Sequence, residues 1–452
     1  MRKVFILIAS LLWAVITHAQ TTLTLEQCRQ LALENNKQMA AAARQTAAAD
    51  YTRRSYRANF FPNFNANGIG LYSAAKGNFS LPGGNLPVFM PDANSQPVPT
   101  GGFAYFPGVE LNYKVRTVWM GGLQMEQPLF MGGKIQAAYR MATLGKEMAQ
   151  VNEVLTATEV ILQTDNAYAL MIKAQEMQKV ATGYNAVLQE LLKNVESAYK
   201  HGLKSKNDLL KVQVKINESE LAIRKAENAL RLAGMNLCHL IGRPLTDRLV
   251  LSEDFPAIEE GLQVQTNNIT DRPEYTLLDK QVAIAKQEVK ISRSELLPQV
   301  GLLASADYLH GLKVNGQTLF DNGNLSVMVN VSIPIFHFGE RINKVRAAKM
   351  KLAQTRIEQA ELNEKMLLEL TQAANNLDEA KLEAALADQA LEQADENRRV
   401  SRSEYEAGLE PLSDHLEAQA LWQQAYEIKV DAHFQLYLSY VKYLKAAGRL
   451  KE

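Results

Sequence analysis

The chain has 452 residues, which is long enough for two or three domains of ordinary size. Lysine and arginine together number 49, as do aspartate and glutamate, so the formal net charge is zero. This balance argues against a nucleic-acid-binding protein, because such proteins usually carry a basic face. Two cysteines are too few for a disulfide scaffold or for most thiolate metal sites.

Residues 1–19 have the pattern of a secretory signal peptide. Arg2 and Lys3 precede an apolar run from Val4 to Ile16, and we predict cleavage after Ala19. Beyond residue 19 there is no run of about 18 apolar residues, so we expect no transmembrane helix in the exported chain. The exported protein is then either soluble in the periplasm or a membrane-spanning β-barrel.

The remaining sequence repeats itself with a constant offset. Tyr199 and Gly202 recur as Tyr405 and Gly408, an offset of 206 (408 − 202), and other positions over some 85 residues follow the same rule. Each half has the same plan of a helix, two strands, a long helix, a tight turn and a returning helix. We place the first repeat at residues 20–242 and the second at residues 271–452. Residues 243–270 form the equatorial segment that connects them.

The expected elements follow from this plan. Residues 74–106 are rich in Gly, Pro, Asn and Ser, and they predict a long surface loop that only the first repeat has. In the long helices, apolar residues step by three and four, which is the seam pattern of a coiled coil. In chain order we expect strands at about 62–74 and 109–127, helices at 134–200 and 205–241, strands at about 298–310 and 323–334, and helices at 340–405 and 412–447.

The ends of the long helices have matching turn signals. Gly202 and Gly408 suit the left-handed residue that closes a helix, and Ser205 and Ser413 are candidate N-caps of the returning helices. The four strands alternate apolar and polar residues, as membrane-spanning strands do, although a soluble sheet with one wet face alternates in the same way. Four strands cannot close a membrane barrel, whereas three chains would supply 12.

Together these features resemble the TolC family of outer-membrane efflux proteins. The N-terminal segment from Leu23 to Asn36 and the turns at Tyr199–Leu203 and Tyr405–Leu409 are similar to that family's. The resemblance implies an α+β membrane protein with a two-fold internal repeat. Each chain would contribute four strands to a trimeric 12-stranded β-barrel in the outer membrane, and coiled-coil helices to a tunnel in the periplasm. It further implies a passive exit duct that docks to a periplasmic adaptor and an inner-membrane pump.

The resemblance also assigns roles at the hairpin tips. Asp208 and Tyr405 match positions in the polar network that holds the periplasmic end closed, and Asp414 and Glu417 match the acidic positions of the constriction. Glu410 stands where the family's best-known member has an arginine, so the familiar bridge to the position of Asp208 is not possible here. The alternative role for Asp208 and Asp414 is charge compensation at a helix N-terminus. Adaptor docking is expected at Tyr199, Gly202, Leu203, Gly408 and Leu409.

Several other possibilities stay open at this level. Cys28 and Cys238 either form a disulfide in the oxidising periplasm or are two small buried hydrophobic side chains. His201 and His415 lie near the tips and could titrate, but solvated or helix-terminal side chains explain them as well. No metal-ligand spacing, phosphate loop or nucleophile motif is present, so we expect no enzyme, metal or cofactor. The rival functions are a soluble coiled-coil adaptor and a solute-specific porin, and neither the cargo nor the pump class is predicted.

Overall fold

The computed structural model describes residues 22–251, 255–259 and 268–450. The expected signal peptide and part of the connecting segment therefore lie outside the described residues. The chain forms two compact units, which comprise residues 1–51, 143–284 and 352–452 in one case and residues 52–142 and 285–351 in the other. Each unit takes segments from both sequence repeats, so the repeats are not separate domains.

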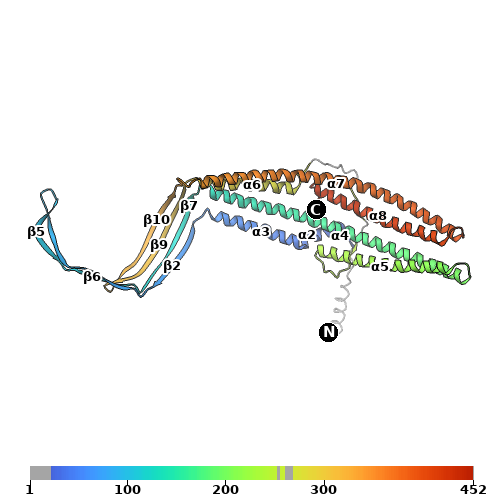
Figure 1. Ribbon diagram of the computed structural model, residues 1–452, viewed down its shortest axis with the longest axis horizontal. Coiled ribbons are helices and arrows are strands. Elements are labelled where there is room, and N and C mark those ends of the chain that lie inside the picture. The colour runs from blue at the N-terminus through green and yellow to red at the C-terminus, as the bar shows by residue number, and fades with distance from the viewer. Residues whose placement is uncertain (1–21, 252–254, 260–267, 451–452) are drawn as a thin grey trace, which may run out of the picture. The chain divides into compact units, whose positions relative to one another are not determined.

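The strand-rich unit is built on four long antiparallel strands (Figure 1). They lie in the order β2, β7, β9, β10, so each repeat contributes two neighbours. Among the described strands, β2 pairs only with β7 and β10 pairs only with β9. The bounds are Asn63–Tyr72 for β2, Thr117–Phe130 for β7, Gln299–Val314 for β9 and Gln317–Ser332 for β10.

Two expectations about this unit were wrong. The strands of the second repeat were expected to stop at about 310 and to begin again at about 323. They extend further, because Asn315 and Gly316, with φ of 50° and 84°, form a two-residue hairpin turn between them. In the first repeat the expected surface loop is also strand, and the strand expected at 109–127 is split in two. The additional strands are β3 (Lys76–Leu81), β4 (Gly84–Pro91), β5 (Pro97–Phe106) and β6 (Val109–Lys114).

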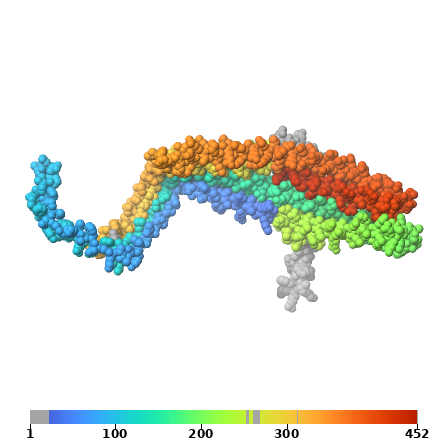
Figure 2. Space-filling model, in the orientation of Figure 1, coloured from blue at the N-terminus to red at the C-terminus, as the bar shows by residue number. Residues whose placement is uncertain are grey.

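The helical unit contains two long antiparallel hairpins, and Figure 2 shows the second of them as adjacent orange and red ridges. The helices α4 and α7 have 67 residues each, which corresponds to about 100 Å. The helices are α2 (Leu25–Asn35), α3 (Lys37–Ala58), α4 (Lys134–Lys200), α5 (Lys206–Leu240), α6 (Pro273–Ser294), α7 (Glu340–Glu406) and α8 (Leu412–Ala446), and a short parallel bridge joins β1 (Thr22–Leu23) to β8 (Val250–Leu251). In the part of the chain that is described, no helix combines the length and apolarity needed to cross a membrane.

The predicted coiled-coil seam is the core of the hairpins. In the first hairpin, Leu188, Leu191 and Val195 of α4 are buried against Val212 and Ile216 of α5. The second hairpin has a smaller seam, in which Leu370 and Leu377 give way to alanines that permit close helix approach. Burying one leucine in such a seam is worth roughly 1.5–3 kcal/mol, so the seams rather than helix propensity hold the hairpins together.

The hairpin turns close as expected at the glycines. Gly202 and Gly408 have φ of 75° and 77°. After α4, the amide of Leu203 donates to the carbonyl oxygen of Ala198 at 2.8 Å. This bond, which spans five residues, is characteristic of a Schellman motif. Ser205 caps α5, but Ser413 does not cap α8, because that helix begins one residue after Pro411, whose extended backbone makes it the N-cap.

A buried ion pair ties the N-terminal helix to the centre of α4. Arg29 of α2 donates from Nε and Nη2 to the two carboxylate oxygens of Asp165, at 2.7 and 2.6 Å, and Asp165 is fully buried. Burial raises the pKa of Asp165, although the guanidinium acts against this. The ionised pair therefore depends on Arg29 to offset the cost of desolvating the carboxylate.

The same core holds both cysteines, and the predicted disulfide is not formed. Cys28 and Cys238 are free, fully buried thiols packed against Leu237 and Ala32. Burial raises the pKa of the Cys28 thiol to about 12, so it stays protonated. The two residues serve here as small hydrophobic side chains, the alternative that the sequence had left open.

Removing Arg29 should destabilise the helical unit strongly. The Arg29→Met substitution leaves a buried carboxylate without its partner, at a cost of about 3–5 kcal/mol. The measurement is guanidinium unfolding followed by circular dichroism. The double variant Arg29→Met/Asp165→Leu should recover most of the loss, because no unpaired charge remains. If the double variant is no more stable than the single one, the pair does not have this role.

Candidate functional site

The tip of the α7–α8 hairpin contains a buried polar cluster. The rings of Tyr405 and His415 are stacked, with centroids 4.9 Å apart and planes 7° apart. Ser401 Oγ lies 2.6 Å from Glu410 Oε2 and 3.3 Å from His415 Nδ1. Ser401 and His415 are each only 4% exposed. We call Ser401, Tyr405, Glu410 and His415 the tip cluster.

Burial and neighbouring charges shift the pKa values of His415 and Tyr405 in the tip cluster. Burial lowers the pKa of His415, whereas the carboxylate of Glu410 acts in the opposite direction. Burial also raises the pKa of Tyr405, and the negative charge of Asp208, from the other hairpin, adds to this effect. Asp208 and Tyr405, which the family resemblance placed in one network, are therefore electrostatically coupled.

The acidic residues at the tips differ in their surroundings. Asp208 forms a reciprocal capping box with Ser205, whose hydroxyl lowers the pKa of the carboxyl group. This contact supports the alternative role of Asp208 at the helix N-terminus. Asp414 is exposed and accepts a hydrogen bond from the Ser413 hydroxyl at 2.8 Å. Glu410 bonds to Ser401 within its own hairpin, so its position is explained without a bridge to Asp208.

An apolar groove runs between the first turns of α5 and α8. Leu210 and Val214, which are 48% and 54% exposed, line it together with Leu416, and Lys211 and Glu417 lie at its margin. The turn residues Leu203 and Leu409 are 77% and 80% exposed, and Tyr199 is 41% exposed. The helical tips thus present several large apolar side chains that this chain does not cover.

The register of the sheet sorts the side chains of its four strands by face. On one face, Phe64, Met125, Ala304 and Val327 form a row across all four strands. The neighbouring row on that face is also apolar and consists of Ala66, Leu123, Ala306 and Leu325. The row between them, on the opposite face, is polar and consists of Asn65, Gln124, Ser305 and Ser326. The predicted alternation is therefore aligned between strands and produces one apolar and one polar face.

Aromatic residues flank the apolar face at the end away from the helices. Trp119 lies 5.3 Å from Tyr308 and 5.8 Å from His310, measured between ring centroids. From Val300 to Tyr308 the strand β9 spans about 26 Å at ~3.3 Å per residue, close to the thickness of the apolar band in outer-membrane proteins. An apolar band with an aromatic boundary is the surface that a lipid bilayer requires.

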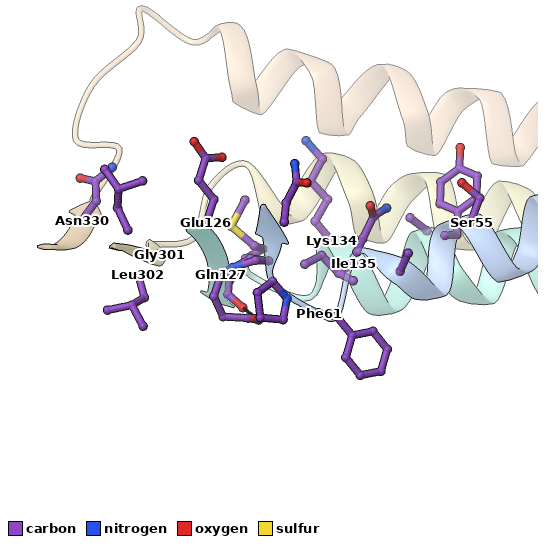
Figure 3. Close-up of a pocket in the computed structure, with 18 of the residues that line it drawn as sticks. Ser55, Phe61, Glu126, Gln127, Lys134, Ile135, Gly301, Leu302 and Asn330 are labelled. Carbon is purple, nitrogen blue, oxygen red and sulfur yellow. Dashed lines mark hydrogen bonds between the residues drawn. The ribbon is translucent and has the colours of Figure 1, made fainter. Parts of the chain in front are cut away.

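A groove of 1090 Å³ lies where the strands meet the helices within the strand-rich unit. Figure 3 shows that Phe61 points away from Glu126 and Lys134, which lie on the other side of the site. Glu126 belongs to the polar face of the sheet, because it pairs with Asn63. The lining of the groove is mixed, because Leu303, Met328 and Asn330 of the same face also border it. Among the described residues, no group of three or more His, Cys, Asp and Glu side chains is placed to hold a metal ion.

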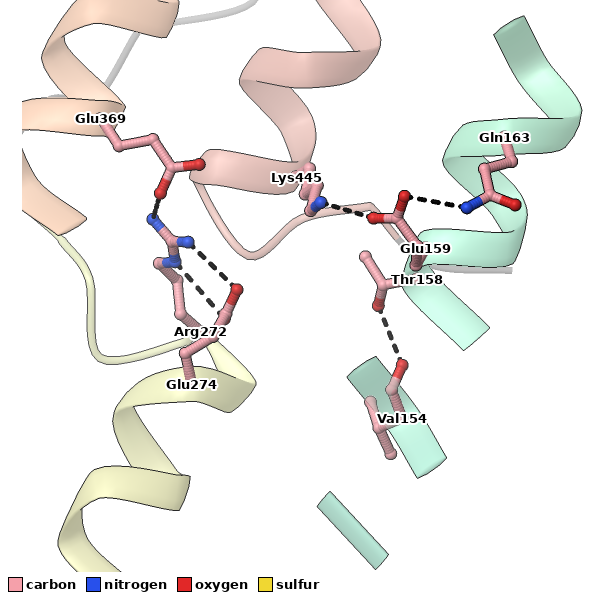
Figure 4. A network of polar contacts seen from close by, with 8 residues as sticks. All are labelled: Val154, Thr158, Glu159, Gln163, Arg272, Glu274, Glu369 and Lys445. Atoms are coloured by element: carbon pink, nitrogen blue, oxygen red, sulfur yellow. Dashed lines mark hydrogen bonds and ion pairs between the residues drawn. The ribbon is translucent and has the colours of Figure 1, made fainter. Parts of the chain in front are cut away.

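A second polar network has a structural role. Arg272, only 3% exposed, donates to Glu274 and to Glu369 of α7, the latter at 2.8 Å (Figure 4). In the same view, Lys445 of α8 donates to Glu159 of α4 at 2.7 Å. These bonds tie the start of the second repeat and the end of the chain to the long helices, and each charge has an opposite partner.

No sequence motif predicted the tip cluster, but a comparison of the two repeats could have identified Ser401 and His415. With the offset of 206, Ser401 corresponds to Val195 and His415 to Leu209 (401 − 195; 415 − 209). Val195 is buried in the seam of the first hairpin and Leu209 packs against it. A serine and a histidine thus occupy seam positions in the second hairpin. The interpretation of His415 as solvated was wrong, whereas its helix-terminal position is confirmed, because it lies in the first turn of α8.

Acidification should loosen the tip cluster. Because the pKa of His415 is lowered from its ordinary value of 6.5, the unfolded tip binds a proton more readily than the folded one. The contribution of neutral His415 to stability is present above pH 6.5 and is lost as the pH falls below it. Hydrogen exchange of the amides of residues 401–415, corrected for intrinsic rates, should be faster at about pH 5.5 than at about pH 7.5.

The matched variants for this measurement come from the repeat. His415→Leu introduces the residue of the equivalent position 209 and should abolish the difference between the two pH values. His201→Gln, at the exposed turn of the other hairpin, should leave the difference unchanged. An unaltered pH difference in His415→Leu would contradict the assignment.

The sequence profile of the outer membrane efflux protein family matches residues 28–243 and 277–449. The pyoverdine export outer membrane protein OpmQ of Pseudomonas aeruginosa is 24% identical over 326 residues, which is 71% of this chain and 67% of that protein. The outer membrane efflux protein BepC of Brucella suis is 24% identical over 400 residues, which is 84% of each chain.

Solved structures share the fold. The Campylobacter jejuni CmeC outer membrane channel superimposes with a TM-score of 0.72 at 18% identity, covering 94% of this chain and 86% of that one. The resemblance to the TolC family is thereby confirmed. The chain belongs to the outer membrane efflux protein family: it is an outer-membrane channel that provides the passive exit for an efflux or secretion system, and not an enzyme.

Proposed function

We propose that three copies of this chain form one duct, which crosses the outer membrane as a 12-stranded barrel and continues into the periplasm as a helical tunnel. The observation that carries the proposal is the sheet with one apolar face and two open edges. Among the described strands, β2 and β10 each have a partner on one side only. In a bilayer every backbone donor and acceptor at those edges requires a partner, and the β2 of a second copy can supply it to β10.

The helical unit supports the same assembly. On α7, the apolar side chains Ile357, Leu368, Leu382 and Leu386 are 70%, 68%, 62% and 54% exposed. Their spacings of 11, 14 and 4 residues place them in one stripe at 3.6 residues per turn, on the side away from the buried seam. A stripe of this kind on a long helix fits the neighbouring helices of another copy.

The polar face of the sheet supports passive conduction. Its central rows, those of Asn65 and Asn67, consist of asparagine, glutamine, serine and glycine with Asp307. The row of Asn63 adds Glu126 beside Leu303 and Met328. A lining of neutral polar side chains does not select strongly by charge. We infer that the cargo is chosen by an inner-membrane pump and its adaptor, which dock at the exposed tip residues Tyr199, Gly202, Leu203, Gly408 and Leu409 and at the groove beside Leu210.

The tips are the proposed gate. In a trimer, Asp414 and Glu417 would each form a ring of three carboxylates, and both are exposed. Such rings attract cations and bind multivalent ones at close range. In the family's best-known member an arginine bridge holds the periplasmic end closed. Here the tip cluster, in which Ser401 donates to Glu410, would take that role.

Charges in the stripe of α7 should separate the copies. Leu368→Glu/Leu382→Glu removes roughly 1.5–3 kcal/mol of apolar burial per leucine and places like charges in each contact. Size analysis in detergent after membrane fractionation should give a trimer for the unsubstituted protein and smaller species for the variant. Asn376→Glu, six residues and a third of a turn from Leu382, should remain trimeric. A soluble monomeric product of the unsubstituted chain would overturn the proposed function.

Neutralising the acidic positions should weaken cation block. In planar bilayers, a trivalent cation added on the helical side should block the trimeric channel. Asp414→Asn/Glu417→Gln should raise the blocking concentration by at least about tenfold, since ~1.4 kcal/mol of binding corresponds to that factor. The control Glu427→Gln alters an acidic residue further along α8 and should leave the block unchanged. Equal block in both variants would exclude the acidic rings.

A further inference from the structure

The outermost hairpin of the strand-rich unit is almost uncharged and very apolar. Residues 82–108 contain a single charged side chain, Asp92. Its large apolar residues are nevertheless exposed, including Leu86 at 56%, Met90 at 63%, Phe103 at 68% and Tyr105 at 71%. Large exposed apolar side chains with so little charge among them mark a contact site. We call residues 84–106, which comprise β4 and β5, the outer hairpin.

Both faces of the outer hairpin are apolar. The register pairs Pro87 with Phe103 and Leu86 with Ala104, so Leu86 and Phe103 lie on opposite faces. Tyr105 shares the face of Phe103. Beyond the register irregularity between Pro87 and Phe89, Met90 pairs with Val98, and its neighbour Phe89 lies on the other face. A hairpin that covered a single surface would need only one apolar face. The outer hairpin therefore requires partners on both sides.

The chemistry of the outer hairpin restricts those partners. Among the described residues, β4 and β5 pair only with each other, so their outer edges carry open backbone groups that cannot enter hydrocarbon. The four prolines Pro87, Pro91, Pro97 and Pro99 have no N–H and disfavour the addition of a further strand. No lysine or arginine is present to bind an anionic headgroup. The partner is thus an uncharged apolar surface that contacts the faces.

The chain topology places the outer hairpin at the end of the sheet away from the helices. The strand β2 begins at Asn63, directly after α3, and β7 ends at Phe130, directly before α4. The insertion that carries the outer hairpin joins the opposite ends of these two strands. In an outer-membrane duct with its helices in the periplasm, this end is the external one.

We propose that the outer hairpins of three copies pack against one another and close the external end of the duct. The inference rests on the trimer of the proposed function. In a closed ring each copy has two neighbours and meets them through two different surfaces, which is the arrangement that two apolar faces permit. The lack of charge fits contact between identical hairpins, because like charges would repel around the axis.

Cysteine cross-linking tests this arrangement. The variant Leu86→Cys/Phe103→Cys places one thiol on each face, and a mild oxidant is applied to the purified trimer in detergent. Covalent dimers and trimers are expected on a denaturing gel without reductant. A bond within one hairpin is not possible, since the two side chains point to opposite faces. The native Cys28 and Cys238 are fully buried and do not interfere.

The matched controls are the two single variants, which should give little cross-linking because the contact joins unlike faces. If Leu86→Cys/Phe103→Cys does not assemble, Phe89→Cys/Met90→Cys replaces it, since these residues also lie on opposite faces. A trimer by size analysis without cross-links in either double variant would overturn the inference and leave the proposed function intact. An unsubstituted chain that is not trimeric would overturn the proposed function itself.

Discussion

The open edges of a four-stranded sheet are the constraint on which the rest of this structure depends. Hydrogen bonds from β2 to β7, β7 to β9 and β9 to β10 leave one edge of β2 and one of β10 without a partner among the described strands. With an apolar face and Asp321 as the one charged side chain on its two edge strands, such a sheet is not stable alone in either water or lipid. The proposed assembly of three copies would pair these edges, and the exposed apolar stripe of α7 would then lie at an interface between copies.

The internal duplication explains why the chain has two strand pairs and two helical hairpins. The two repeats provide equivalent strand pairs and helical hairpins, and Schellman turns at Gly202 and Gly408 end the long helices in the same way. The repeats differ in the connection between their two strands. One strand pair closes with the two residues Asn315 and Gly316, whereas the other carries the outer hairpin. The insertion is thus confined to the end of the sheet where it does not disturb the apolar band.

Periodic features were predictable from the sequence, and contacts between distant segments were not. The alternation in β10 predicted its apolar and polar faces, and the steps of three and four in α4 predicted its buried seam. The turn at Asn315 was also predictable, since Asn-Gly is a strong hairpin signal, but the predicted strands stopped at about 310 and began again at about 323. The ion pair of Arg29 with Asp165 joins residues 136 positions apart, and no local pattern specifies that pairing. The cap of α8 was misassigned because Ser413 follows Pro411, which already fixes the extended N-cap conformation.

The tip cluster makes the two hairpins unequal in stability. Seam positions filled by Val195 and Leu209 in the first hairpin hold Ser401 and His415 in the second. Each apolar side chain lost from a seam forfeits roughly 1.5–3 kcal/mol of burial. A hydrogen bond between neutral groups returns only about 1 kcal/mol, whereas one to a carboxylate, such as that of Ser401 to Glu410, returns roughly 1.5–3 kcal/mol. The α7–α8 tip therefore combines the apolar contacts of Leu412 and Leu416 with polar contacts that depend on protonation, while the seam of the α4–α5 tip is held by packing that does not. Since regions with the weakest apolar packing open first, a movement at this end of the chain would begin in the second hairpin and leave the first as its fixed support.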